Sequence, residues 1–258
     1  MKDISIIIPI HQYNDELKNY FINAINSVPN EDDNLSIIVI GPKDIIAKYK
    51  EIEIDYQGRT ISFIENEKSD FASQINEGAK VCGTEYFSIL EVDDEYTPIW
   101  FKNVQEHIAA YPEISIFLPL TEVRDVSAER PVFVGFANEI ALSASFSENI
   151  GYIDLDALLT YSDFNVTGAV IKTSDYLEVG GLKPSLKLVF WYEFLLRLAN
   201  SSKEIYTIPK AGYCHSLRRN DSYMLECEKI EKEEAQWWFN TAKQEYFFKE
   251  DRNKVFTK

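Results

Sequence analysis

The first ninety residues alternate between short runs rich in isoleucine and valine and longer segments whose apolar residues recur at helical spacing. Buried strands that alternate with amphipathic helices are typical of βαβ units around a parallel sheet. The pattern predicts strands at 4–9, 35–40, 60–64 and 85–90. It predicts helices that begin at Asn14 or Asp15, at Asp44, and at Ser69, the last one ending at Gly83.

Beyond residue 97 the same periodicities predict a second group of elements. We expect helices at 98–110, 174–179 and 189–200, strands at 114–118, 165–171 and 205–209, and a turn at Gly180–Gly181. Residues 122–147 carry weak signals and are interpreted as irregular or hairpin structure. A long, charged and aromatic-rich helical stretch is expected at 223–252. No repeat or Gly/Ser linker marks a boundary, so we predict a domain at 1–222 with a helical extension, 223–258, packed on it.

Charge narrows the possible functions. Acids outnumber bases by 42 to 26, which gives a net charge of -16. Such a field disfavours a general nucleic-acid or anionic-membrane surface. Three cysteines without metal-type spacing suit a reducing compartment. No apolar run reaches the ~18 residues that a membrane span needs, and the first residues lack the form of a signal peptide. We therefore expect a soluble, cytoplasmic protein.

The acidic run Glu91-Val92-Asp93-Asp94 follows the fourth predicted strand. Open parallel sheets bind ligands beyond the carboxyl ends of their strands, so this run lies where a site would lie. Carboxylates two positions apart can hold one side of Mg²⁺ or Mn²⁺, with substrate phosphates completing the shell. Taken alone, such a run is more often a solvated turn.

Six segments, in their order and spacing, resemble motifs of the family-two glycosyltransferases. They are 4–14, 74–87, 90–98, 167–169, 180–182 and 195–198. The resemblance implies an α/β GT-A fold, which is a Rossmann-like nucleotide-diphospho-sugar transferase fold, with a mixed central sheet and here a long C-terminal helical segment.

The resemblance also implies an activity: metal-dependent, inverting transfer of a sugar from a nucleotide-diphosphate donor to a hydroxyl acceptor, with Mn²⁺ or Mg²⁺ as cofactor. It implies metal ligands at Asp93, Glu91 and His215, and catalytic residues at Glu193, as the base, and Asp94. The residues implied to bind the nucleotide sugar are Pro9, His11, Asn14, Asn76, Glu91, Asp93 and Arg218. Arg219 is a further candidate for the diphosphate.

Three positions depart from the family pattern. The turn at 41–44 lacks the acid that contacts the nucleotide base, and Ile75 replaces an arginine. Phe190-Trp191 replaces the acidic pair that supplies the usual base, so Glu193 becomes the nearest candidate; the alternative is an ordinary acid in the first turn of a helix. Trp191 and Tyr192 form either a sugar platform or part of the core.

These departures keep a second hypothesis open, a catalytically silent GT-A domain that binds nucleotide sugars or glycans or serves in assembly. The acceptor of an active enzyme would be a glycan, a lipid-linked sugar, a protein or, less in keeping with the charge, a modified DNA base. The aromatic C-terminal segment covers the acceptor cleft, contacts a partner or forms a homodimer, unless it only seals the core.

Overall fold

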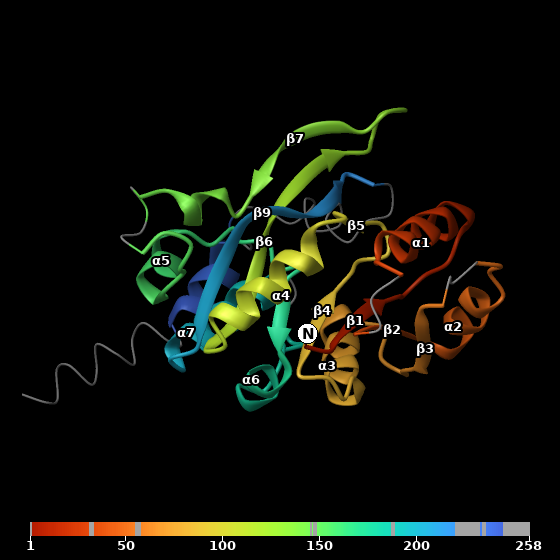
Figure 1. Ribbon diagram of the computed structural model, residues 1–258, viewed down its shortest axis with the longest axis horizontal. Coiled ribbons are helices and arrows are strands. Elements are labelled where there is room, and N and C mark those ends of the chain that lie inside the picture. Colours follow the sequence, from red (N-terminus) through yellow and green to blue (C-terminus); the bar gives the residue numbers. More distant parts are fainter. Residues whose placement is uncertain are drawn as a thin grey trace, which may run out of the picture.

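One mixed sheet organises the chain (Figure 1). The computed structural model describes residues 2–30, 34–54, 58–144, 146, 149–186, 189–219, 233 and 236–244. Within these residues the strands follow the order β3-β2-β1-β4-β8-β6-β9-β5, and β7 pairs with the outer part of β6. The predicted α/β architecture with a mixed central sheet is confirmed.

The first half of the sheet is parallel. Its strands are β1 (Ile4–Pro9), β2 (Leu35–Gly41), β3 (Thr60–Glu65) and β4 (Tyr86–Ile89). The helices between them are α1 (Asp15–Ser27), α2 (Lys43–Lys50) and α3 (Phe71–Val81). Asn14 and Asp70 cap α1 and α3, because each side chain accepts a hydrogen bond from a backbone N–H three residues on. All four strands therefore end at the same edge of the sheet.

The second half changes strand direction. It contains β5 (Glu95–Tyr96), α4 (Trp100–Ala110), β6 (Ile114–Asp125), β7 (Val132–Ala137), the 3₁₀ turn η1 (Glu139–Leu142), α5 (Leu155–Thr160), β8 (Val170–Lys172), α6 (Thr173–Glu178), α7 (Phe190–Asn200) and β9 (Glu204–Leu217). Strand β8 is antiparallel to both β4 and β6, whereas β9 is parallel to β6.

Two apolar cores lie on opposite faces of the sheet. Helices α1, α2 and α4 cover one face, and α3, α5, α6 and α7 cover the other (Figure 1). Residues 236–244 are helical and join the second core through Trp238, Phe239 and Ala242. The rest of the predicted helix at 223–252 lies outside the described residues. Among the described helices, none combines the length and the apolarity that crossing a bilayer requires.

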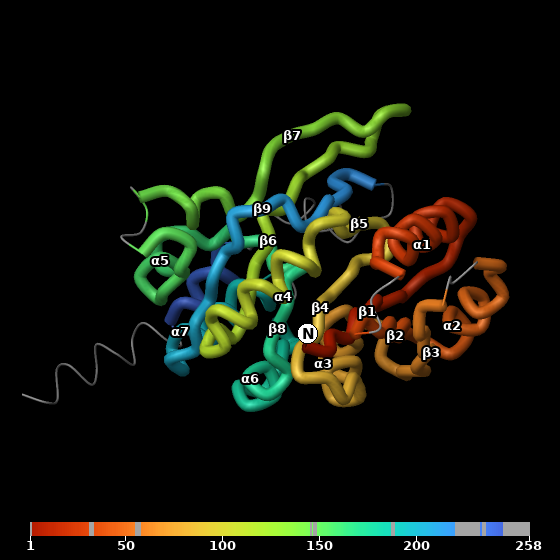
Figure 2. Tube along the Cα trace, in the orientation of Figure 1, coloured from red at the N-terminus to blue at the C-terminus, as the bar shows by residue number. Residues whose placement is uncertain are grey.

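Three strand predictions need correction. The strand expected at 205–209 continues to Leu217, and the strand expected at 114–118 continues to Asp125, because the two pair along their length through several register shifts. Residues 121–137 form a hairpin, β6 with β7, that extends beyond the rest of the described chain (Figure 2). The strand expected at 165–171 is limited to Val170–Lys172, since Gly168 turns the backbone with φ of 78°.

Gly168 links this turn to the strands around it. Its carbonyl accepts a hydrogen bond from the indole Nε1 of Trp100 at 2.9 Å. A Cβ at this position would lie 2.4 Å from Cδ2 of the fully buried Tyr213 ring. Tyr213 in turn accepts a hydrogen bond from the backbone N–H of Glu91 at 3.0 Å. Only glycine therefore satisfies both the backbone angle and the close approach of the ring.

We predict that Gly168→Ala lowers the free energy of unfolding by about 2–4 kcal/mol, because a left-handed backbone costs about 1 kcal/mol and overpacking about 1–3 kcal/mol. Two controls separate the causes. At Gly58 the backbone has a positive φ, but an added Cβ would meet no atom within 4 Å; at Gly135 there is neither a positive φ nor such a contact. Gly58→Ala and Gly135→Ala are therefore the controls. Urea unfolding of the three variants would measure the difference; equal losses in Gly168→Ala and Gly58→Ala would mean that Tyr213 moves aside freely.

Candidate active site

The acidic run lies in a tight turn at the carboxyl end of β4. Leu90 donates its backbone N–H to Ile7 at 3.0 Å, which holds the end of β4 to β1. The turn closes where the N–H of Asp94 donates to the carbonyl of Glu91 at 3.1 Å. Residues 91–94 thereby project from the edge of the sheet at which the parallel strands end.

Strand β9 brings a histidine to this turn. Glu95 pairs with Cys214 across the antiparallel β5–β9 ladder, so Asp94, which precedes Glu95, lies opposite His215, which follows Cys214. Nδ1 of His215 lies 2.9 Å from Oδ2 of Asp94, and the backbone N–H of Ser216 donates to Oδ1 at 2.8 Å. Both oxygens of Asp94, whose side chain is 1% exposed, are therefore satisfied. His215 therefore lies within β9, whereas the sequence analysis ends the strand at residue 209.

Glu91, Asp94 and His215 form one group of potential metal ligands. One donor atom from each lies within 4.8 Å of the others. Two carboxylate oxygens and an imidazole nitrogen suit Mn²⁺, and the oxygens suit Mg²⁺. The chemistry of this donor set thus fits the divalent cation that the sequence analysis expects.

The electrostatics of the group favour bound positive charge. Burial, with the negative charge of Asp94, raises the pKa of the Glu91 carboxyl to about 8. Burial alone would lower the pKa of His215, but Asp94, followed by Glu91 and Asp93, raises it to about 10. Glu91 and His215 therefore retain protons that a bound cation would displace.

Asp93 faces a different partner. Its Oδ2 accepts a hydrogen bond from Nε of Arg219 at 2.6 Å, and the two side chains are 10% and 4% exposed. Burial is the main cause that raises the pKa of Asp93, and Arg219 opposes it. The neighbouring Arg218 instead pairs with Asp125 at 2.7 Å, and its side chain is 54% exposed. The structure therefore groups Asp94, rather than Asp93, with Glu91 and His215.

The predicted residues of the first strand and turn lie at the same sheet edge. Pro9 ends β1, which pairs with β4. His11 is exposed in the loop that follows, and Asn14 is the exposed N-cap of α1. The Asn14 side chain already accepts a hydrogen bond from Leu17 at 2.8 Å. The positions of these residues suit a nucleotide site, and their binding role stays a prediction.

Asn76 belongs to a second polar cluster, around the Gly180–Gly181 turn. Its Oδ1 accepts hydrogen bonds from the hydroxyl of Tyr176 at 2.6 Å and the backbone N–H of Leu182 at 2.8 Å. Its Nδ2 donates to the carbonyl of Leu182 at 2.8 Å. The amide thus holds the turn against α3.

Glu193 enters the same cluster from α7. Its side chain is 1% exposed and lies 2.7 Å from Arg197 and 2.8 Å from Lys183. Arg197 also donates to the carbonyls of Val179 and Gly181. Both oxygens of Glu193 are ion-paired, so the carboxylate orients the arginine that holds the turn. Its role as a base stays a prediction.

The structure also assigns the residues around the missing acidic pair. The hydroxyl of Tyr192 is buried and donates to the carbonyl of Leu158 at 2.7 Å, so this ring belongs to the core. Trp191 is half-buried, edge-on to Phe71 with ring centroids 6.0 Å apart.

Sequence reasoning missed Tyr213 and Ser216. Ser216 acts through its backbone N–H, which no side-chain pattern marks. Tyr213 has the appearance of an ordinary strand aromatic.

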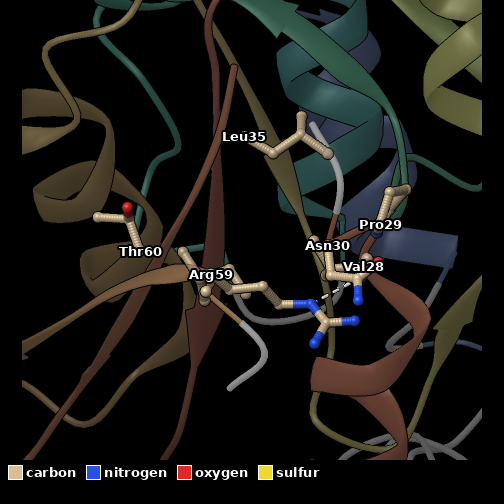
Figure 3. A pocket seen from close by; sticks show the side chains of 8 residues that line it. Val28, Pro29, Asn30, Leu35, Arg59 and Thr60 are labelled. Carbon is tan, nitrogen blue, oxygen red and sulfur yellow. Dashed lines mark hydrogen bonds between the residues drawn. The ribbon is translucent and has the colours of Figure 1, made fainter. Parts of the chain in front are cut away.

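A surface pocket lies away from these residues. Val28, Asn30, Leu35, Arg59 and Thr60 are among its lining residues, at the amino ends of β2 and β3 (Figure 3). The Arg59 side chain points along it and donates from Nε to the carbonyl of Val28 at 2.8 Å. Because the acidic turn follows the carboxyl end of β4, which is parallel to these strands, the pocket belongs to the opposite edge of the sheet.

Solved structures of S. aureus TarS share the fold. The TarS 1–349 structure in complex with UDP-GlcNAc matches with a TM-score of 0.58 and 15% identity, over 86% of this chain and 60% of that one. A second structure of TarS 1–349 matches with a TM-score of 0.57 and 16% identity, over 83% of this chain and 60% of that one. The longer TarS structure matches with a TM-score of 0.57 and 16% identity, over 95% of this chain and 43% of that one. The chain thus spans at most about three-fifths of these neighbours.

These neighbours bear out the GT-A fold expected from the sequence. No curated protein matches the chain by sequence. The sequence profile of glycosyl transferase family 2 matches residues 5–163, which is more than half of the chain and includes the acidic turn. The chain therefore belongs to glycosyl transferase family 2.

Proposed function

We propose that the chain transfers a sugar from a nucleoside-diphosphate donor to a hydroxyl acceptor, with inversion at the anomeric carbon. The observation that carries this proposal is the Glu91–Asp94–His215 group at the carboxyl edge of the sheet, in a chain of this family. The UDP-GlcNAc complex of TarS supports a UDP-sugar as the first donor to examine.

Mn²⁺ or Mg²⁺ would be held by Glu91, Asp94 and His215. When bound, such a cation stabilises the negative charge that develops on the leaving diphosphate. Asp94 holds the imidazole of His215 through Nδ1, which leaves the other ring nitrogen, Nε2, as the ligand atom for the metal. The backbone N–H of Ser216 keeps the Asp94 carboxylate in place from its other oxygen. Asp93 is the remaining candidate ligand.

The acceptor hydroxyl must lose a proton as it attacks, which requires a base. Glu193 is the candidate that the sequence suggests, but its two cationic partners, Lys183 and Arg197, occupy both oxygens of its carboxylate. To act as the base, Glu193 must exchange Lys183 or Arg197 for the acceptor. The acceptor itself is proposed only as a hydroxyl compound: a glycan, a lipid-linked sugar, a protein or a modified DNA base.

The ion pairing of Glu193 favours a second candidate function, a silent GT-A domain that binds nucleotide sugars or assembles with a partner. Residues 190 and 191 are aromatic, and the nearest acid is fully ion-paired. Binding of a nucleotide sugar without turnover in the wild-type chain would select this alternative. A homodimer through the C-terminal helical segment is a further proposal, which sedimentation would test.

We predict that His215→Ala weakens Mn²⁺ binding at least ~10-fold, since it removes one of three clustered donors. The measurement is the rise in melting temperature that UDP or UDP-GlcNAc produces with and without Mn²⁺, because a ligand of the native state stabilises it. The metal-dependent part of the rise should fall, by at least the ~1.4 kcal/mol that a tenfold weaker Kd implies.

His107→Ala is the matched control, since His107 lies in α4 and bonds its own helix. Each variant is compared with its own ligand-free melting temperature, so a change in intrinsic stability does not enter. Equal metal-dependent shifts in wild type and His215→Ala would exclude His215 as a ligand.

We predict that Glu193→Gln separates the two roles of that carboxylate. As a base, its loss lowers kcat by about 10²–10⁴ with nucleotide binding unchanged. As the partner of Arg197, its loss destabilises the chain by about 3 kcal/mol. Turnover and urea unfolding measure the two effects.

Asp175→Asn is the control, because it breaks a comparable ion pair, with Lys203 at 3.0 Å. A fall in kcat no greater than that of the control, alongside the loss of stability, would remove Glu193 as the base.

A further inference from the structure

Strand β7 presents apolar side chains that the described part of the fold does not cover. None of its six residues, Val132–Ala137, is charged. Val132 and Val134 are each 56% exposed, Phe133 is 54% exposed and Phe136 is 39% exposed. Together these four side chains form an apolar patch of roughly 400 Å², a size at which the largest patch of a protein surface is often functional.

The backbone of β7 is open along one side. Among the described strands, β7 pairs with β6 alone, and it forms the upper margin of the described chain in Figure 1. Its outer edge is therefore a row of N–H and C=O groups without a ladder partner in the described fold. Natural proteins usually protect such an edge with a lysine or a proline inside the strand, and β7 contains neither.

The two phenylalanines of the patch point away from the metal-ligand group. Paired residues of neighbouring strands point to the same face of a sheet, and His215 pairs with Val123, which in turn pairs with Gly135. Phe136 alternates with Gly135 and so lies on the opposite face. The register shift in the β6–β7 ladder brings Phe133 to that face too, where the two rings lie 5.3 Å apart.

The charge of the hairpin differs from that of the whole chain. With a net charge of -16, two copies of the chain repel one another over most of their surfaces. Residues 121–137 instead hold three acids and two bases, and Arg218 adds a third positive charge through its ion pair with Asp125. Positive and negative charges are thus equal in number at the hairpin, so this is a part of the surface where a second copy can approach.

We propose that β7 is the surface through which two copies of this chain associate, with their β7 strands antiparallel about a twofold axis perpendicular to the sheet. Another strand is the occupant that satisfies the open N–H and C=O groups, whereas a lipid surface would leave them unpaired. The twofold axis keeps Phe133 and Phe136 of both copies on one face, so the four rings form one cluster. This inference does not depend on the proposed function.

The size of the patch predicts a weak dimer. Two copies would cover roughly 800 Å² of apolar surface, which is less than the ~1,200 Å² at which stable interfaces begin. We therefore expect a dissociation constant in the range of about 10–100 µM. Because the hairpin extends beyond the rest of the described chain, this contact also keeps the acidic bodies of the two copies apart (Figure 2).

Sedimentation of the full chain over about 1–500 µM, a range that brackets this dissociation constant, is the first test. Val134→Lys should raise the dissociation constant at least ~10-fold, because it places a lysine from each copy on the shared edge. Phe133→Ser combined with Phe136→Ser should have the same effect, because the ring cluster is lost. Val134→Lys alone decides the matter if the double variant does not fold.

Matched controls alter exposed apolar side chains elsewhere on the chain. Val81 in α3 is 44% exposed and Leu177 in α6 is 43% exposed. Val81→Lys makes the same change of charge as Val134→Lys, and Val81→Ser combined with Leu177→Ser removes comparable apolar surface. Both controls should change the dissociation constant less than about twofold, as expected for exposed positions outside the interface.

Hydrogen exchange locates the contact. At about 500 µM chain, where the dimer predominates, the amides of β7 should exchange at least ~5-fold more slowly than at about 1 µM, because pairing protects them. The amides of β3, which forms the opposite margin of the sheet, should exchange equally at both concentrations.

Association that Val134→Lys weakens, together with slower exchange in β7 at high concentration, supports the proposal. A chain that stays monomeric up to about 500 µM would overturn it; flotation of that monomer on phosphatidylcholine vesicles, lost in Val134→Lys, would then assign the patch to a lipid surface. A dimer that Val134→Lys leaves unchanged would also overturn it and would favour the C-terminal helical segment as the contact.

Discussion

The crowding of three carboxylates in one turn, that of Asp94 buried and those of Glu91 and Asp93 half-buried, is the constraint on which the rest of this structure depends. Glu91, Asp93 and Asp94 cannot leave water as free anions, so each needs a proton, a cation or a hydrogen-bond donor. Strand β9 and the residue pair after it supply these partners: His215 and the Ser216 amide for Asp94, and Arg219 for Asp93. The pKa of the Glu91 carboxyl is raised by burial and by Asp94. Glu91, Asp94 and His215 together offer ligand atoms suited to a divalent ion.

The fold positions this turn from both sides. The parallel strands end at one edge, and Tyr213, packed on Gly168, anchors the backbone of Glu91 from the second half of the sheet. A separate cluster of Asn76, Glu193 and Arg197 holds the Gly180–Gly181 turn on the other face. The first cluster contains groups whose pKa values are strongly raised, Glu91 and His215, whereas the carboxylate of the second is paired with two cations, so the first is the better candidate for ligand binding and the second for support.

Much of this arrangement is readable from the sequence, and the remainder has identifiable physical causes. Strand periodicity places the acidic run at the sheet edge, and the spacing of Glu193 and Arg197 is that of a helical ion pair. Periodicity does not reveal that β9 continues through Pro209 and Gly212, because those residues normally end strands and the partner β6 tolerates them through register shifts. Nor does it reveal which acid meets Arg219, since that depends on the conformation of residues after a strand.

The late position of β9 in the sequence also affects how the chain folds during its synthesis. Asp94 and His215 are 121 positions apart, and β5, which follows the acidic turn, pairs with β9. On a ribosome, the parallel strands emerge long before the strand that neutralises their acidic end. We therefore expect the carboxylates of the turn to stay hydrated until β9 docks, because their partners His215 and Arg219 are not yet in place.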